Sequence, residues 1–90
     1  MSASSDSRRA VRLPAGVDLH ARPAGALVRA AAAYQSSVTL HACGKQADAK
    51  SILQVLALGA TGGSEVEVQT CGADASEALD SITGLLATLA

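Results

Sequence analysis

The stretch from residue 18 to residue 34 reads Asp18-Leu-His20-Ala-Arg22-Pro23-Ala-Gly-Ala-Leu-Val-Arg-Ala-Ala-Ala-Ala-Tyr34. Proline is tolerated in the first turn of a helix because its missing N–H would have no intrahelical partner there. After Pro23, apolar residues recur at helical spacing on one side, namely Ala24, Leu27, Val28, Ala31 and Tyr34. The stretch therefore predicts an amphipathic helix over residues 21–34, with His20 at its start.

The place of His20 gives its ring a particular chemical environment. Free backbone N–H groups and the positive end of the helix dipole meet at a helix start, where phosphate binds well. A positively charged ring is disfavoured there, so the imidazole stays neutral and nucleophilic, and an anion attached to it is stabilised. Arg22 is the obvious second contact for that anion. The alternative is an ordinary surface histidine at the end of a loop.

Periodicity and capping signals predict the remaining elements. Strict alternation of apolar and polar residues indicates strands over residues 8–13, 37–42 and 65–69, and a short return strand is expected over 46–49. Ser51 and Gln54 have the spacing of a capping box, and Gly59 can supply a left-handed C-terminal cap, so residues 51–58 are expected to form a short helix. Asp74 and Glu77 mark the start of a last helix.

Length and composition agree with one small domain. The 90 residues carry a formal net charge of −1 and one aromatic side chain, Tyr34, so neither nucleic acid nor a membrane surface is an expected partner. No apolar stretch approaches the ~18 residues of a spanning helix, and residues 1–7 lack the apolar core of a secretory signal. We expect a cytoplasmic monomer with a domain over 8–90 and a disordered tail over 1–7.

Two further features limit the chemistry. Cys43 and Cys71 lack a metal-type spacing, and a reducing compartment argues against a bridge, so both thiols are expected to be free. His41 lies on the polar side of its strand and is interpreted as a solvent-facing residue. No P-loop or acidic metal triad appears, so we expect no cofactor and no metal site.

The expected order is strand, helix, strand, strand, helix, strand, helix. Four alternating strands have one apolar face to cover, and three amphipathic helices can cover it. The other face of the sheet stays in water. The sequence therefore predicts an α+β fold, a two-layer open-faced sandwich with the order β-α-β-β-α-β-α.

Two motifs resemble those of a known family. The stretch Leu19-His20-Ala21-Arg22-Pro23-Ala24 resembles the active-site motif of HPr, the histidine-containing phosphocarrier of the bacterial phosphoenolpyruvate:sugar phosphotransferase system. The segment from Lys50 to Gly59 resembles the family's regulatory-serine segment, and the resemblance extends over residues 8–90. It implies a four-stranded antiparallel sheet and a protein that carries a phosphoryl group without being a stand-alone catalyst.

The resemblance also implies residue roles and partners. Phosphorylated enzyme I would pass its phosphoryl group to Nδ1 of His20, which would hand it to the A components of sugar-specific enzyme II. Ser51 would be a regulatory site for a serine kinase/phosphorylase, with a transcriptional regulator as a further partner. Ile52, Leu53 and Leu56 would form an apolar surface that docks enzyme I, although ordinary core packing is the alternative for these residues, above all for Leu56. Arg22, Arg29 and Lys50 would form a basic rim around it.

Two departures and two alternatives accompany this interpretation. Asp18 and Gln54 stand where the family commonly has glycine, and Asp18 is a candidate cap for the first helix. One alternative is a mainly regulatory interaction protein controlled by Ser51 phosphorylation. The other is an HPr-like module of a dihydroxyacetone kinase phosphorelay.

Overall fold

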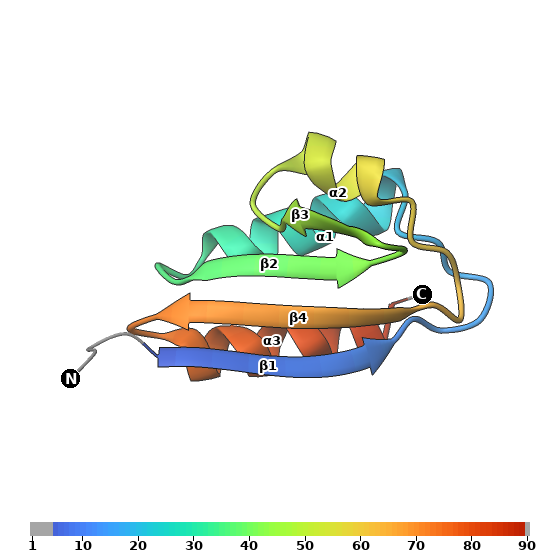
Figure 1. Cartoon of the computed structure of the whole chain (residues 1–90). Coiled ribbons are helices and arrows are strands. Elements are labelled where there is room, and N and C mark those ends of the chain that lie inside the picture. Colours follow the sequence, from blue (N-terminus) through green and yellow to red (C-terminus); the bar gives the residue numbers. More distant parts are fainter. Residues whose placement is uncertain (1–4, 90) are drawn as a thin grey trace.

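A computed structural model describes residues 5–89 of the chain (Figure 1). Four strands and three helices follow one another in the predicted order, which is confirmed. Their bounds are β1 Ser5–Arg12, α1 Ala21–Ala32, β2 Ser37–Ala42, β3 Lys45–Asp48, α2 Ile52–Leu58, β4 Glu65–Gly72 and α3 Ala75–Ala87.

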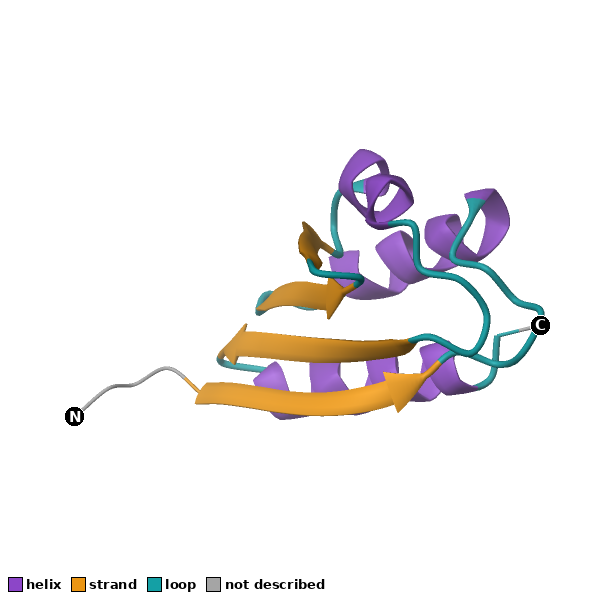
Figure 2. Cartoon of the chain, turned by 45° about the vertical axis from the view of Figure 1, so that its right-hand side comes forward, coloured by secondary structure: helices purple, strands orange, loops and turns teal. Residues whose placement is uncertain are grey.

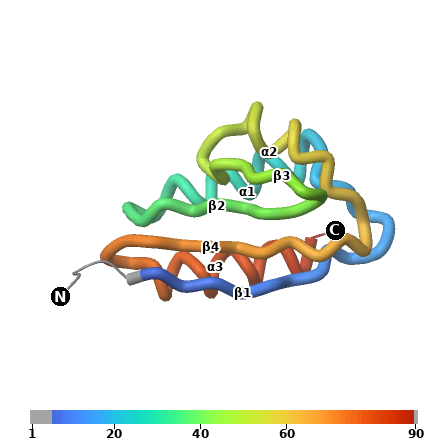
Figure 3. The backbone as a smooth tube through the Cα atoms, viewed as in Figure 1, coloured from blue at the N-terminus to red at the C-terminus, as the bar shows by residue number. Residues whose placement is uncertain are grey.

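The strands form one antiparallel sheet in the order β1-β4-β2-β3. The strand β4 therefore lies between β1 and β2, although it is the last of the four strands along the chain, as the backbone trace in Figure 3 shows. Helices α1 and α3 lie behind the sheet in Figures 1 and 2, and α2 packs against α1 and β3. The result is the predicted open-faced α+β sandwich.

The core lies between the sheet and the helices. In β2 and β4, buried residues alternate with partly exposed ones, as expected when only one face of a sheet is covered. The helices contribute apolar side chains to the same cluster, including Leu27, Ala31, Ile82 and Leu86. None of the helices within residues 5–89 combines the length and hydropathy needed to cross a bilayer.

The ends of several elements differ from the sequence prediction. The strand β1 begins at Ser5 and pairs its first residues with Thr70, Cys71 and Gly72, so residues 5–7 belong to the sheet and not to a disordered tail. The reason is that β4 continues beyond the expected residue 69 to Gly72 and offers its backbone groups to them. Residues 1–4 lie outside the described part of the chain.

Helix α1 ends at Ala32, two residues earlier than predicted. Ala33 N donates to Ala30 O and Tyr34 N to Ala31 O, each at 3.2 Å, so the last turn tightens into i→i−3 bonds. Helix α2 begins at Ile52 with Ser51 as its N-cap, and β3 covers residues 45–48 instead of 46–49. These shifts leave the fold unchanged.

Asp74 occupies the N-cap position of α3 but makes no side-chain capping bond. Its carboxylate accepts hydrogen bonds from Gln35 N at 3.0 Å, from Ser36 N at 2.8 Å and from the Ser36 hydroxyl. These bonds, led by the one from the Ser36 side chain, lower the pKa of Asp74 from 3.8 to about 2. The Asp74 side chain therefore does not cap α3. It joins the connection between α1 and β2 to the start of α3 instead.

Candidate functional site

His20 is the N-cap residue of α1. Its backbone is extended (φ −111°, ψ −158°), its carbonyl accepts from Ala24 N at 2.7 Å, and its exposed side chain makes no capping bond. The first-turn N–H groups of a helix have no intrahelical partner, and the first turn of α1 contains no acidic residue. The imidazole is therefore accessible beside unneutralised backbone donors, as the sequence predicts.

Arg22 lies two residues into the same helix, and its side chain is exposed. The ion pairs found among residues 5–89 are Arg8–Glu67 and Arg9–Asp80, so the Arg22 guanidinium has no carboxylate partner in this part of the chain. Together, His20, Arg22 and the helix start can receive a tetrahedral anion such as a phosphoryl group.

Asp18 does not cap α1. Its Oδ1 accepts from Gly62 N at 2.8 Å, and Leu19 N donates to Ala60 O at 2.9 Å. The segment before His20 is thereby joined to the segment that follows α2. The Asp18 side chain is committed to Gly62 and does not satisfy the N–H groups at the start of α1.

Helices α1 and α2 pack against each other, and two hydrogen bonds show that they run in opposite directions. The carboxyl end of α2 lies near His20, as the Leu19–Ala60 bond shows. Its amino end lies near the end of α1, where Lys50 Nζ donates to Tyr34 O at 2.8 Å. Since α2 has seven residues, its ends are about 10 Å apart, and Ser51 is at the end away from His20.

Ser51 is the N-cap of α2, and its hydroxyl accepts from Gln54 N at 3.3 Å. Gly59 takes the left-handed conformation at the other end, with φ 70°. The reciprocal half of the predicted capping box is wrong, because Gln54 Oε1 accepts from Asp48 N at 2.9 Å. Ser51 N instead donates to Asp48 O at 2.9 Å, so it needs no side-chain acceptor.

Two large apolar side chains of α2 are exposed: Ile52 at 39% and Leu53 at 76% of their area. We call this pair the α2 patch. Leu56, predicted to belong to the same surface, is partly buried and packs against the core. Arg29 is exposed on α1, whereas Lys50 is half-buried and holds Tyr34 O. Of the three cations predicted to form a basic rim, Lys50 is therefore already engaged within the fold.

The family model described as "PTS HPr component phosphorylation site" matches residues 7–88. This match covers nearly the whole chain. The chain belongs to the HPr family.

Individual HPr proteins support this assignment. The phosphocarrier protein HPr of Mycoplasma capricolum subsp. capricolum is 41% identical over 66 residues, which are 73% of this chain and 74% of that protein. The crystal structure of a phosphocarrier protein HPr from Bacillus anthracis str. Ames is 30% identical, with a TM-score of 0.82 over 94% of this chain and 99% of that one. The solution structure of Crh, the Bacillus subtilis catabolite repression HPr, is 35% identical, with a TM-score of 0.72 over 91% and 95% of the two chains.

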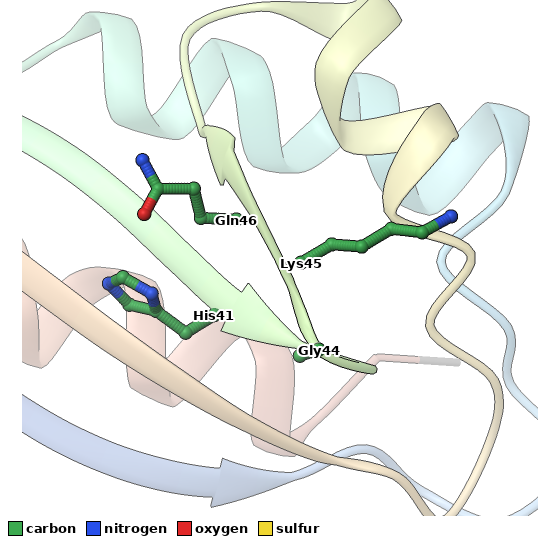
Figure 4. A pocket seen from close by; sticks show the side chains of 5 residues that line it. His41, Gly44, Lys45 and Gln46 are labelled. Carbon is green, nitrogen blue, oxygen red and sulfur yellow. The ribbon is translucent and has the colours of Figure 1, made fainter.

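The second histidine of this HPr-family chain lies on the open face of the sheet. His41 and Gln46 border a surface depression in Figure 4, while the Lys45 side chain extends away from them. His41 Nε2 lies 3.0 Å from Oε1 of Gln69 on β4, and the residue is half-buried instead of fully solvent-facing. The sequence did not reveal this partner, because Gln69 is 28 residues away along the chain and reaches His41 only through the pairing of β2 with β4.

The thiols and other candidate ligands stay apart. Cys43 is exposed in the β2–β3 turn with φ 56°, Cys71 is near the end of β4, and both are free. Ser37, the first residue of β2, pairs with Cys71, so the two cysteines lie near opposite ends of β2. Within residues 5–89, no three His, Cys, Asp or Glu side chains are arranged to hold a metal ion.

Proposed function

We propose that this chain is a phosphocarrier that accepts a phosphoryl group on His20 from phosphorylated enzyme I and passes it to A components of enzyme II during phosphoenolpyruvate-dependent sugar uptake. The observation that carries the proposal is the exposed His20 imidazole at the start of the 12-residue helix α1, without a capping bond of its own. Membership of the HPr family supports the same reaction.

The transfer is a displacement at phosphorus. A lone pair of the neutral imidazole, on Nδ1 by resemblance to the family, forms the new N–P bond while the bond from phosphorus to enzyme I breaks. The electron pair of that bond stays with enzyme I. The phosphoryl oxygens gain stabilisation from the first-turn N–H groups of α1 and from the Arg22 guanidinium. Transfer to the enzyme II component repeats the displacement with His20 as the leaving group.

The α2 patch is the proposed docking surface for enzyme I. Ile52 and Leu53 expose apolar area on the helix whose far end joins the segment before His20. Arg22 and Arg29 are seven residues apart on the exposed side of α1 and would attract an acidic partner at low ionic strength. Lys50 contributes by holding Tyr34 O, in the segment directly after α1.

Ser51 is the proposed site of regulation by a serine kinase/phosphorylase. A phosphate there would lie at the positive end of α2 and add roughly two negative charges beside the α2 patch. Because Ser51 is at the end of α2 away from His20, we expect the charge to act on docking and not on the imidazole itself. Similarity to Crh, the catabolite repression HPr, favours a second role as a regulatory partner of a transcriptional regulator.

The test is incubation of the pure chain with phosphoenolpyruvate and a bacterial enzyme I, followed by intact mass measurement. One acid-labile phosphoryl group is expected on the wild type and on the control His41→Ala, and none on His20→Ala. Arg22→Ala should fold normally and react more slowly, since its side chain is exposed. Label that survives on His20→Ala would overturn the assignment, and an unchanged rate would remove Arg22 from the site.

A further inference from the structure

Asp18 lies two residues before His20, and its carboxylate has a specific partner. Asp18 Oδ1 accepts a hydrogen bond from Gly62 N at 2.8 Å. The carbonyl of the same residue accepts from His20 N at 2.8 Å. One residue therefore contacts both the backbone of His20 and a loop that lies 44 residues further along the chain.

The two segments that Asp18 joins are in close contact. We call residues 13–20 the histidine loop and residues 59–64 the glycine loop; they lie together at the right of Figure 1. Leu13 N donates to Ser64 O at 2.9 Å, and Leu19 N donates to Ala60 O at 2.9 Å. A Cβ at Gly62 would lie 2.5 Å from Gly16 N, which is closer than real Cβ contacts allow. The two loops therefore leave no space for a side chain at residue 62.

Among these contacts, the bond from Gly62 N to Asp18 is made by a side chain close to His20. Backbone contacts fix the histidine loop at Leu13 and Leu19. The Asp18 carboxylate adds a side-chain bond at the residue whose own carbonyl accepts from His20 N. A charged acceptor forms a stronger hydrogen bond than a neutral one. Leu19 would still be held by Ala60 O after loss of this bond, but the Asp18 carbonyl that accepts from His20 N would be less tightly fixed.

The same bond also decides where the negative charge points. A carboxylate two residues before the N-cap could otherwise approach the unpaired N–H groups of α1, which are good carboxylate ligands. There it would compete with the oxygens of an incoming phosphoryl group. The bond to Gly62 N directs the carboxylate toward the glycine loop instead.

We propose that Asp18 is a positioning residue for phosphoryl transfer, which fixes the backbone of His20 against the glycine loop and keeps its own charge away from the start of α1. This inference rests on the proposed function of His20. It predicts an effect on the transfer step and not on docking, because Asp18 is not part of the α2 patch.

The experiment compares Asp18→Ala, Asp18→Asn and the control Asp80→Ala. Asp80 is an exposed residue of α3, and its carboxylate accepts from Arg9 at 2.9 Å. Its replacement removes one negative charge, as Asp18→Ala does, without affecting either loop. For each variant, initial rates of His20 phosphorylation are measured over a range of chain concentrations with catalytic enzyme I. Hydrogen exchange of the Gly62 amide is followed by NMR on the unphosphorylated chains.

For Asp18→Ala we expect kcat to fall by roughly three- to tenfold, the range of one lost hydrogen bond. The KM for the chain should stay unchanged, and the Gly62 amide should exchange faster. Asp18→Asn keeps an oxygen acceptor and should recover most of the rate, while Asp80→Ala should match the wild type.

Three results would overturn the inference. These are a wild-type kcat for Asp18→Ala, an Asn variant as slow as the Ala variant, or a loss expressed in KM alone. A wild-type chain that accepts no phosphoryl group would instead refute the proposed function. In that case the Gly62 exchange still tests the contact, because an unchanged rate in Asp18→Ala would show that the carboxylate does not hold the glycine loop.

Discussion

Replacing Leu53 by alanine should separate docking from folding. Leu53 is 76% exposed, so the fold buries about a quarter of it. Complete burial of a leucine side chain is worth about 1.5–3 kcal/mol, so truncation should lower the free energy of unfolding by only ~0.5 kcal/mol. The remaining area is available to a partner. If enzyme I covers most of it, the loss is about 1–2 kcal/mol of binding, or roughly a five- to thirtyfold rise in KM.

Val55 provides the matched control on the same helix. It is 0% exposed, so Val55→Ala removes buried methyl groups and should cost roughly 2 kcal/mol of stability. In a chain of 90 residues this corresponds to a fall in Tm of roughly 8–16 °C. Since the side chain does not reach the surface, KM for the folded variant should equal that of the wild type.

The assay measures initial rates of phosphohistidine formation over a range of chain concentrations, with catalytic enzyme I and excess phosphoenolpyruvate. Thermal unfolding followed by circular dichroism gives the stability of each variant. The expected pattern is a raised KM with nearly unchanged Tm for Leu53→Ala, and the opposite for Val55→Ala. An unchanged KM for Leu53→Ala, or an equal rise for both variants, would refute the docking role of the α2 patch.

Three more predictions concern the rest of the chain. Ser51→Ala should lower stability by ~1 kcal/mol through loss of the N-cap, whereas phosphorylated Ser51 should keep its Tm and slow His20 phosphorylation; equal rates would leave Ser51 as a cap alone. The pKa of Asp74 is lowered from 3.8 to about 2 in the folded chain. The charged carboxylate therefore stabilises the fold fully at pH values above its ordinary pKa. That contribution is lost as the pH falls through about 2, so urea denaturation should find Asp74→Asn less stable than wild type at neutral pH, by a margin that shrinks in acid; a constant margin would contradict this. Cys43 and Cys71 should both react with a thiol reagent after unfolding without reductant, and a mass lowered by one pair of hydrogens would indicate a bridge instead.

Local patterns predicted the elements well where neighbouring residues decide the structure. The alternation in β2 and β4 identifies the buried face because successive side chains of a strand point to opposite sides. Ser51 and Gly59 mark the ends of α2 because each acts on backbone groups within one turn. The same reasoning placed His20 at the start of α1.

Partners that come from distant segments were missed. Asp74 has the sequence context of a helix cap, yet its carboxylate accepts from the backbone N–H groups of Gln35 and Ser36. Ser36 is 38 residues away along the chain. Lys50 was expected to face a partner protein but holds Tyr34 O. Sequence context suggested that Asp74 would cap its own helix and that Lys50 would face a partner protein. Packing instead brought a backbone group from another segment within reach of each side chain.

The sequence by itself determined the order of the elements, the covered face of the sheet and the position of His20 at a helix start, because periodicity and capping act over a few residues. Only the tertiary structure decided the partners of Asp18, Lys50 and Asp74. Their hydrogen bonds join loops far apart in the chain, and a buried or crowded backbone group accepts whichever donor or acceptor the fold brings to it. No pattern along the chain encodes that choice, since it depends on how the helices and the sheet come together.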